Sequence, residues 1–376
     1  MTKKPVRKPA PVRKSTSRAP AKPAVPRVGD PDLLRELSNT VAVSGDEGAV
    51  RKIVLEAIRP HVDEVKVDAL GNVLALKKGT GRSKDRVLIA AHMDEVGFMV
   101  TDIDPEGALR FEIVGGIDDR MLMGKPVWVG PKRLPGLIGA MPIHMLTSDR
   151  MSSVTKAAQL RIELGVNSAE AAKKLVKVGD RGTFATEFAA LGPALRGKAL
   201  DDRLGCATLI ELLRGPAYPC DLHAAFTVQE EVGLRGARVA GYAVEPTCAF
   251  ALDCTPAADL PDSRGRENTL YNARLGRGPV IYRVDRSTIS DERLVKYLQQ
   301  TAEKASLPYQ FRQPGGGGTD AGAIHLTREG VPSVSVSVPG RYLHSPAAIV
   351  RTEDWRNTLR LMQLALENWT PKVMKR

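Results

Sequence analysis

Cysteine is scarce in this chain of 376 residues, and none of its four cysteines belongs to a C-x-x-C pair. Without that spacing the sequence does not indicate a zinc finger. The four stand in apolar segments such as TCAFALDC; they are Cys206, Cys220, Cys248 and Cys254. We therefore expect buried, reduced thiols and a cytoplasmic location.

Aromatic residues make up only 5% of the chain, and no apolar run reaches the roughly 18 residues that a membrane span needs. The second absence excludes a transmembrane protein. A hydrophobic fraction of 43% and a charged fraction of 26% are typical of a soluble globular protein. Because 376 residues exceed what one core usually organises, we expect one large domain and a smaller one.

Acidic residues are absent from residues 1–29, which hold nine of the 55 Lys and Arg residues and six prolines. The formal net charge of +12 therefore belongs largely to this segment, since 46 basic and 43 acidic residues remain elsewhere. With no aromatic residue to bury, the segment is predicted to be a disordered tail. Binding to nucleic acid is expected only through this tail, and an organelle transit peptide stays open, although the prolines oppose an amphipathic helix.

From residue 31 onward, helix and strand patterns alternate, which predicts a layered α/β domain. The segment GAVRKIVLEAI (48–58) has apolar residues on one helical face, and Gly71-Asn72 is the predicted turn of a hairpin. Further helices are predicted over 201–213, over 291–305 and from Thr352, with strands over 87–91, 222–228, 248–253 and 332–338. In the last helix the spacing of Trp355, Leu359, Met362 and Leu366 predicts core residues.

Residues 101–188 interrupt this alternation with short strand candidates such as ALRFEIVGG and KPVWVG, separated by Gly and Pro, and one helix candidate, SAEAAKKLVK. They predict an inserted β-rich module. The catalytic α/β domain would then consist of residues 30–100 and 189–376.

Acidic residues and histidines gather where predicted strands end or helices begin, and open α/β sheets bind ligands outside the carboxyl ends of their strands. These positions are His92 and Asp94 in AAHMDEVG, Asp201 and Asp202 in GKALDDRLG, Glu230 and Glu231 in FTVQEEVG, and Asp253 in FALDCT. Each acid taken singly is explained by a turn or a helix cap. Together they would repel one another unless protons, cations or solvent intervene.

His92 and Asp94 lie two residues apart, so on an extended backbone they point the same way and the carboxylate can hold the second imidazole nitrogen. A buried core histidine is the alternative for this motif alone. His344 follows the strand over 332–338 and matches the strand-end position of His92. Two histidines and three carboxylates fit a pair of divalent ions that share one carboxylate, with Zn²⁺ or Co²⁺ favoured and one acid left as general base.

These segments make the chain similar, over about residues 31–370, to the M42 family of metallo-aminopeptidases, the tetrahedral aminopeptidases. The resemblance rests on AAHMDEVGFMV, GKALDDRLG, QEEVGLRGA, ALDCTPAADLP and GGGGTDAGAIHLTREGVPSVSVSVPGRYLHSP, and on their order. It implies the fold of co-catalytic zinc exopeptidases, an α/β/α sandwich, with a small PDZ-like β-barrel for dimerisation inserted where residues 101–188 stand. It also implies a homo-oligomer that acts on peptides, with dimers that assemble into a tetrahedral dodecamer.

The resemblance assigns roles residue by residue. It implies that His92 and Asp253 hold one metal, that Glu231 and His344 hold the other, and that Asp201 bridges them, often with a cis peptide bond after it. Glu230 would be the general base for a water held between the metals, and Asp94 the partner of His92. Glycine-rich PGGGGTDAGAI would help to shape the substrate pocket, with supporting roles for Thr319 and Asp320.

Two other functions stay open at this point. A glycoside hydrolase of the endoglucanase type also uses two carboxylates. That function would leave both histidines without a role, and this chain lacks the aromatic surfaces that sugars favour. A non-enzymatic nucleic-acid or assembly protein would act through the basic tail. The sequence does not reveal which N-terminal residue a peptidase would prefer, among glutamyl, leucyl and deblocking types.

Overall fold

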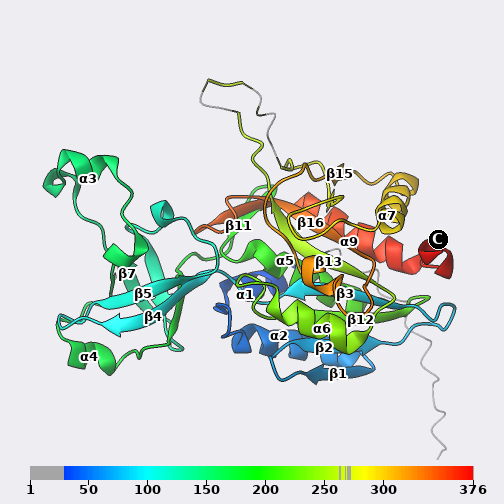
Figure 1. Ribbon diagram of the computed structural model, residues 1–376, viewed down its shortest axis with the longest axis horizontal. Helices are drawn as coiled ribbons and strands as arrows, with labels where there is room; N and C mark the ends of the chain where they lie inside the picture. The colour runs from blue at the N-terminus through cyan, green and yellow to red at the C-terminus, as the bar shows by residue number, and fades with distance from the viewer. Residues whose placement is uncertain (1–28, 262–263, 267, 269–271, 376) are drawn as a thin grey trace, which may run out of the picture.

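The computed structural model describes residues 29–261, 264–266, 268 and 272–375. The basic tail predicted over residues 1–29, and with it the nucleic-acid and transit-peptide alternatives, lies outside the described residues except for Gly29. Figure 1 shows two lobes, a large α/β body and a β-rich lobe that projects from it on the left.

A single large sheet runs through the body, and in the described part of the chain it has eleven strands. Its centre is parallel, with β12 (Asp221–Thr227), β3 (Arg86–His92), β13 (Cys248–Pro256) and β16 (Ser333–Arg341) side by side. Antiparallel strands extend both edges: β1 (Glu64–Val67) and β2 (Val73–Lys77) beyond β12, and β17 (Ala348–Arg351), β11 (Ala194–Gly197) and β10 (Ala189–Leu191) beyond β16. The short strand β14 (Val280–Ile281) pairs with β16 and with β15 (Gln310–Phe311).

Helices cover both faces of this sheet, so the predicted α/β/α sandwich is confirmed. One face carries α1 (Pro31–Asn39), α2 (Gly48–Ile58), α5 (Leu200–Arg214), α7 (Glu292–Lys304) and α9 (Thr352–Glu367). The other carries α6 (Arg235–Val244) and α8 (Ala321–Ile324). Along β3, Val87, Ile89 and Ala91 pack into the first core, while Leu88 and Ala90 pack into the second, as expected for a strand buried on both sides.

Local sequence explains where the covering helices begin and how they face the core. The carboxylate of Asp30 accepts hydrogen bonds from the backbone N–H groups of Asp32 and Leu33 and so caps α1. In α9 the predicted core residues Trp355, Leu359, Met362 and Leu366 are all buried. Short 3₁₀ turns, η1 (Arg59–His61) and η5 (Pro371–Met374), follow α2 and α9. Among the described helices, none combines the length and apolar character needed to cross a membrane.

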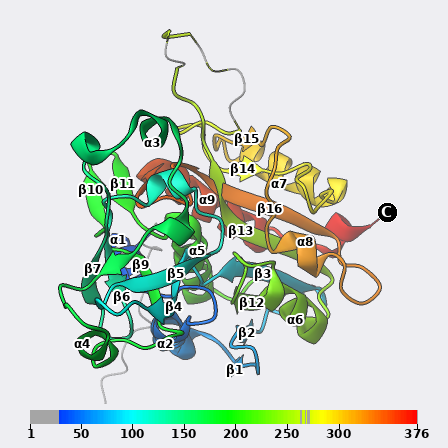
Figure 2. The ribbon, with the colours of Figure 1, turned by 60° about the vertical axis from the view of Figure 1, so that its left-hand side comes forward.

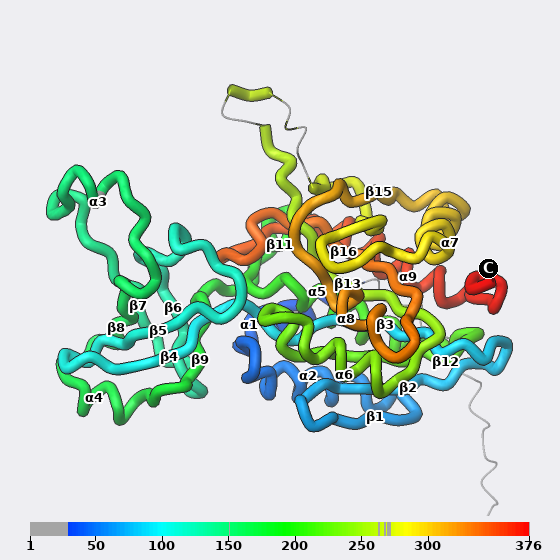
Figure 3. Tube along the Cα trace, viewed as in Figure 1, coloured from blue at the N-terminus to red at the C-terminus, as the bar shows by residue number. Residues whose placement is uncertain are grey.

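The projecting lobe is a closed barrel with strand order β4-β5-β8-β7-β6-β9. The tube in Figure 3 shows it beside the body, and in Figure 2, turned by 60°, the same lobe comes forward and overlaps the body in the view. Its strands are β4 (Gly97–Ile103), β5 (Leu109–Val114), β6 (Pro126–Val129), β7 (Leu134–Ile138), β8 (Ile162–Glu163) and β9 (Arg181–Phe184). Short helical turns connect them: η2 (Asp119–Met121), η3 (Ile143–Met145), α3 (Ser148–Ser152), η4 (Ala157–Gln159) and α4 (Ala169–Lys173).

The barrel has an apolar core of its own. Phe98 stacks edge-to-face on Phe111 and Phe184, with ring centroids 5.2 and 5.1 Å apart. The strands run from Gly97 to Phe184, whereas the predicted module covers residues 101–188. The helix predicted in SAEAAKKLVK is shorter than its pattern and ends at Lys173.

Candidate metal centre

Strand ends bring the predicted ligands together at one edge of the parallel sheet. His92 is the last residue of β3, Glu230 and Glu231 follow β12, and His344 follows β16. Asp253 lies within β13, beyond the segment Cys248–Ala251 that pairs with β3. The parallel register therefore places groups separated by up to 252 residues in sequence around one site.

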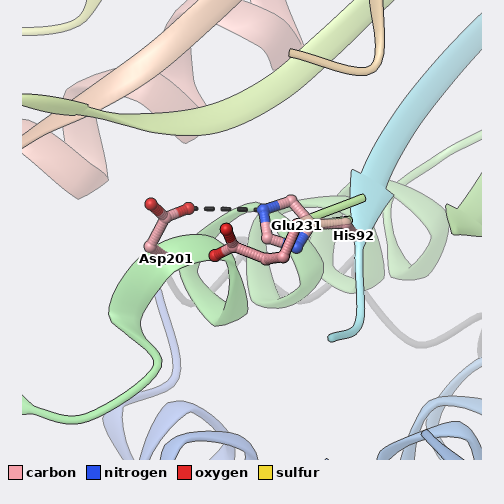
Figure 4. Close-up of side chains that lie close together, drawn as sticks. All are labelled: His92, Asp201 and Glu231. Atoms are coloured by element: carbon pink, nitrogen blue, oxygen red, sulfur yellow. Dashed lines mark ion pairs between the residues drawn. The ribbon is translucent and has the colours of Figure 1, made fainter. Parts of the chain in front are cut away.

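Asp201 lies between the two histidines. Its Oδ1 is 3.3 Å from Nε2 of His92, and its Oδ2 is 3.5 Å from Nε2 of His344. Asp253 Oδ1 approaches His92 Nε2 at 3.9 Å, and Glu231 Oε2 approaches His344 Nε2 at 3.5 Å. Asp253 thus approaches only His92 and Glu231 only His344 among these pairs, while Asp201 approaches both imidazoles. Figure 4 shows His92 and Asp201 with Glu231 beside them.

Asp201 owes this position to an irregular first turn of α5. Ala199, just before the helix, has left-handed backbone geometry with φ 52°, and neither Asp201 nor Asp202 has helical dihedral angles. The peptide bond between Asp201 and Asp202 is cis, as the family resemblance implies.

Burial makes the charges of this site interdependent. Burial raises the pKa of Glu230 and of Asp253 well above their ordinary values, and raises that of Glu231 to about 7. Burial would also raise the pKa of Asp201, but hydrogen bonds from the two imidazoles hold it well below its usual range. The site therefore holds more carboxylates than its two imidazoles can neutralise.

This donor set fits divalent cations. Ligand atoms of His92, Asp201 and Glu231 lie within 4.8 Å of one another, as do those of Asp201, Asp202 and Cys254. The Oδ2 atom of Asp202 is buried without a hydrogen-bond partner among the described residues. Imidazole and carboxylate donors with an excess of buried negative charge are the groups that bind zinc-like ions.

Asp94 lies beside His92, and its predicted role as the partner of that imidazole stays a prediction. The Oδ1 atom of Asp94 is 3.6 Å from Nδ1 of His92. The backbone carbonyl oxygen of Asp94 lies closer to the same Nδ1 atom, at 3.1 Å. The carboxylate also accepts hydrogen bonds from the backbone N–H groups of Glu230 and Glu231, at 3.0 and 3.2 Å, and from the Ser44 hydroxyl at 2.6 Å. The chain turns after β12, which places these two N–H groups over Asp94, so its side chain fixes the turn that carries both glutamates.

Thr319 and Asp320 are both buried. The Thr319 hydroxyl pairs with that of Ser335 at 2.7 Å, and Asp320 Oδ2 accepts a hydrogen bond from Thr227 at 2.5 Å. Burial raises the pKa of Asp320 to about 6. Their predicted roles in substrate binding stay predictions.

A buried ionic group supports the site and is missing from the sequence prediction. Glu95 accepts hydrogen bonds from Lys198 at 2.8 and 2.9 Å and from Arg203 at 3.3 Å, and all three side chains are at most 2% exposed. It also accepts from Ala42 N–H and from the hydroxyl of Thr183 in β9. Glu95 stands in AAHMDEVG, and Lys198 and Arg203 stand in GKALDDRLG, but nothing in either segment predicts that they pair.

The centre lies where the barrel meets the body. One cavity is lined by Asp201, Glu231 and His344 together with Thr183 and Phe184 of the barrel.

Comparison with known proteins identifies the family. A family model described as M42 glutamyl aminopeptidase matches residues 71–361. The chain belongs to the M42 peptidase family. Among M42 relatives, the lysyl aminopeptidase of Pyrococcus furiosus is 32% identical over 350 residues, which cover 91% of this chain and 98% of the relative. The glutamyl aminopeptidase of Lactococcus lactis is 34% identical over 334 residues, which cover 86% and 92%.

A solved structure agrees with the sequence relatives. The TET1 peptidase of Pyrococcus horikoshii is 35% identical, with a TM-score of 0.79 and coverage of 90% of this chain and 99% of that one; it can assemble into a tetrahedron or a large octahedral shell. The predicted M42 resemblance is therefore confirmed, and this M42 protein is an aminopeptidase that hydrolyses peptides. The lysyl and glutamyl relatives differ in name, so the family does not fix the preferred residue.

Proposed function

We propose that this M42 peptidase is a two-metal aminopeptidase that removes N-terminal residues from peptides. The observation that carries the proposal is the position of Asp201, with one carboxylate oxygen toward His92 and the other toward His344. Asp253 would complete the ligands of the first cation and Glu231 those of the second. Zn²⁺ or Co²⁺ suits this mixture of imidazole and carboxylate donors.

Bound divalent cations would supply a water of lowered pKa and positive charge for the developing oxyanion. Glu230 is the acid without a metal-holding role, and burial keeps its pKa well above its ordinary value. Glutamate is one of the side chains that transfer protons as a general base or acid. In this proposal Glu230 takes the proton of the attacking water and then delivers it to the nitrogen of the departing peptide.

Asp94 would support this transfer indirectly. Its carboxylate binds the backbone N–H groups of both Glu230 and Glu231, so one side chain fixes the proton-transferring acid relative to the metal-holding one. The excess of buried carboxylates would also favour a substrate with a free, positively charged α-amino group over one with a blocked terminus.

The assembly and location of the protein are further parts of the proposal. A barrel that projects from the body supports a role in dimerisation, and a solved TET1 dodecamer that is 35% identical to this chain supports assembly of such dimers into a dodecamer. The four buried free cysteines support a cytoplasmic location. The endoglucanase alternative is not favoured, because the family model and both relatives describe aminopeptidases.

Paired chromogenic substrates test this function. Leucyl, glutamyl and lysyl anilides would each be offered with a free and with an acetylated α-amino group. We expect turnover of free-amine substrates only, its loss in a strong chelator, and its return with Zn²⁺ or Co²⁺. Undiminished turnover in the chelator, or equal cleavage of acetylated substrates, would contradict the proposal.

A further inference from the structure

His344 is the less constrained of the two candidate histidine ligands. Its side chain is 43% exposed, compared with 2% for His92. It lies on the turn after β16, where Tyr342 and His344 both have left-handed backbone geometry, with φ of 61° and 55°. An exposed imidazole on such a turn needs a second contact to keep one orientation, since an unrestrained side chain samples several rotamers.

The barrel supplies that contact. Nδ1 of His344 lies 2.9 Å from the backbone carbonyl of Gly116, in the segment between β5 and η2. A carbonyl oxygen only accepts, so Nδ1 must carry the hydrogen and donate it. The opposite ring nitrogen, Nε2, then faces Asp201 and Glu231, at 3.5 Å from each.

Two glycines allow the barrel backbone to come this close. A Cβ atom on Gly116 would lie 3.2 Å from Nδ1 of His344. Gly115 has φ +84°, and a Cβ atom there would lie 2.8 Å from Val96 Cγ1 and 3.3 Å from Cβ of Glu231. The segment therefore touches both predicted ligands of the second cation, and side chains at these positions would push it away.

We propose that Gly116 is a positioning residue: its carbonyl fixes the ring orientation and tautomer of His344, so the inserted barrel completes one half of the metal centre. The hydrogen bond itself is independent of any metal, while its consequence for cation binding rests on the proposed function. Loss of the hydrogen-bond partner of a metal-binding histidine typically lowers metal affinity by roughly 10- to 100-fold. The barrel is thus part of the catalytic centre, in addition to any role in assembly.

Gly116→Ala tests the proposal, with Gly139→Ala as the matched control. Both glycines lie in the barrel segment outside the left-handed region, but a Cβ on Gly139 would meet only Glu163 Oε1, at an ordinary 3.6 Å. Each metal-free protein would be titrated with Zn²⁺, and the affinity of each site would be measured by competition with a chromophoric chelator. In Gly116→Ala we expect one of two sites to weaken by roughly tenfold or more and the other to stay unchanged. Two unchanged sites, or the same loss in Gly139→Ala, would overturn the proposal.

A second measurement needs neither metal nor activity. In metal-free protein labelled with ¹⁵N-histidine, the Nδ1–H of His344, assigned by its absence in His344→Gln, should exchange slowly with water. We expect fast exchange in Gly116→Ala and slow exchange in Gly139→Ala. Fast exchange in the wild-type protein would refute the hydrogen bond. If exchange is slow but the wild type binds no divalent cation, the proposed function fails while the contact between barrel and His344 stands.

Discussion

The two halves of the proposed metal centre are built differently. The His92 half comes entirely from the body: the imidazole ends a buried strand, its Nδ1 faces a carbonyl two residues away, and its neighbour Asp253 lies on the adjacent strand. The His344 half combines an exposed imidazole on a turn with a carbonyl from the barrel. The first half depends on elements of the body alone, whereas the second also depends on how the barrel packs against the body. Changes in the barrel should therefore affect one half selectively.

Glu230→Gln should have the largest effect and leave both halves intact. Removal of a general base costs about 10²- to 10⁴-fold in kcat, because the amide cannot accept the proton of the attacking water. Metal content should stay at the wild-type level, as measured by elemental analysis of the purified protein. Glu106→Gln, at an exposed position of the barrel, serves as control. Metal loss in Glu230→Gln would give this residue a ligand role instead.

Alanine substitutions of the carboxylate ligands should separate the halves. Glu231→Ala should lose the cation beside His344, and Asp253→Ala the cation beside His92, since each carboxylate approaches one imidazole. Asp201→Ala should lose both, because its two oxygens face both imidazoles. The measurement is the number of Zn²⁺ equivalents bound at saturation. Equal loss in all three variants would show that the halves do not bind independently.

Glu95→Gln should destabilise the junction of body and barrel. It leaves the buried Lys198 and Arg203 without their carboxylate, and breaking a buried ion pair costs about 3–5 kcal/mol of the free energy of unfolding. Urea denaturation of the metal-free protein measures this loss. Glu112→Gln, on an exposed position of β5, should change stability by less than about 0.5 kcal/mol. A similar small change in Glu95→Gln would mean that the ion group is dispensable.

Acid should weaken the same junction, with a smaller effect. Burial raises the pKa of Glu95, but Lys198 and Arg203 outweigh burial and hold it below the ordinary value of 4.5. A carboxylate whose pKa falls on folding stabilises the protein above its unfolded pKa and loses that contribution as pH falls through the folded pKa. Wild-type stability should therefore drop below about pH 4.5 by more than that of Glu95→Gln. Parallel stability curves from pH 6 to pH 3 would contradict this assignment.

Much of the fold follows from local pattern. The helical spacing in residues 48–58 and the buried run of β3 depend on hydrophobic periodicity, which each segment carries by itself. The edge strands β10, β11, β14, β15 and β17 are absent from the prediction, because two to four residues are too few to show a period. Strand β11 pairs with β17, and β14 pairs with β15 and β16, across long stretches of sequence, whereas β10 forms a hairpin with its neighbour β11.

The partners of individual site residues show where sequence reasoning stops. Asp94 is identified from its spacing to His92, but the contact of its carboxylate with the turn at Glu230 and Glu231 joins residues 136 and 137 positions apart. The pairing of Glu95 with Lys198 and the contact between Gly116 and His344 span 103 and 228 positions. Such contacts depend on packing of whole elements, so no local motif encodes them.

The sequence by itself determines the family of this M42 peptidase and which strands end near carboxylates and imidazoles, the groups proposed to hold cations. Tertiary structure alone decides how these groups are held. Parallel register sets Asp253 against His92, the irregular first turn of α5 places Asp201 between the histidines, and the barrel reaches His344 with a backbone carbonyl. Every residue has such a carbonyl, so only the path of the folded chain sets this one beside His344.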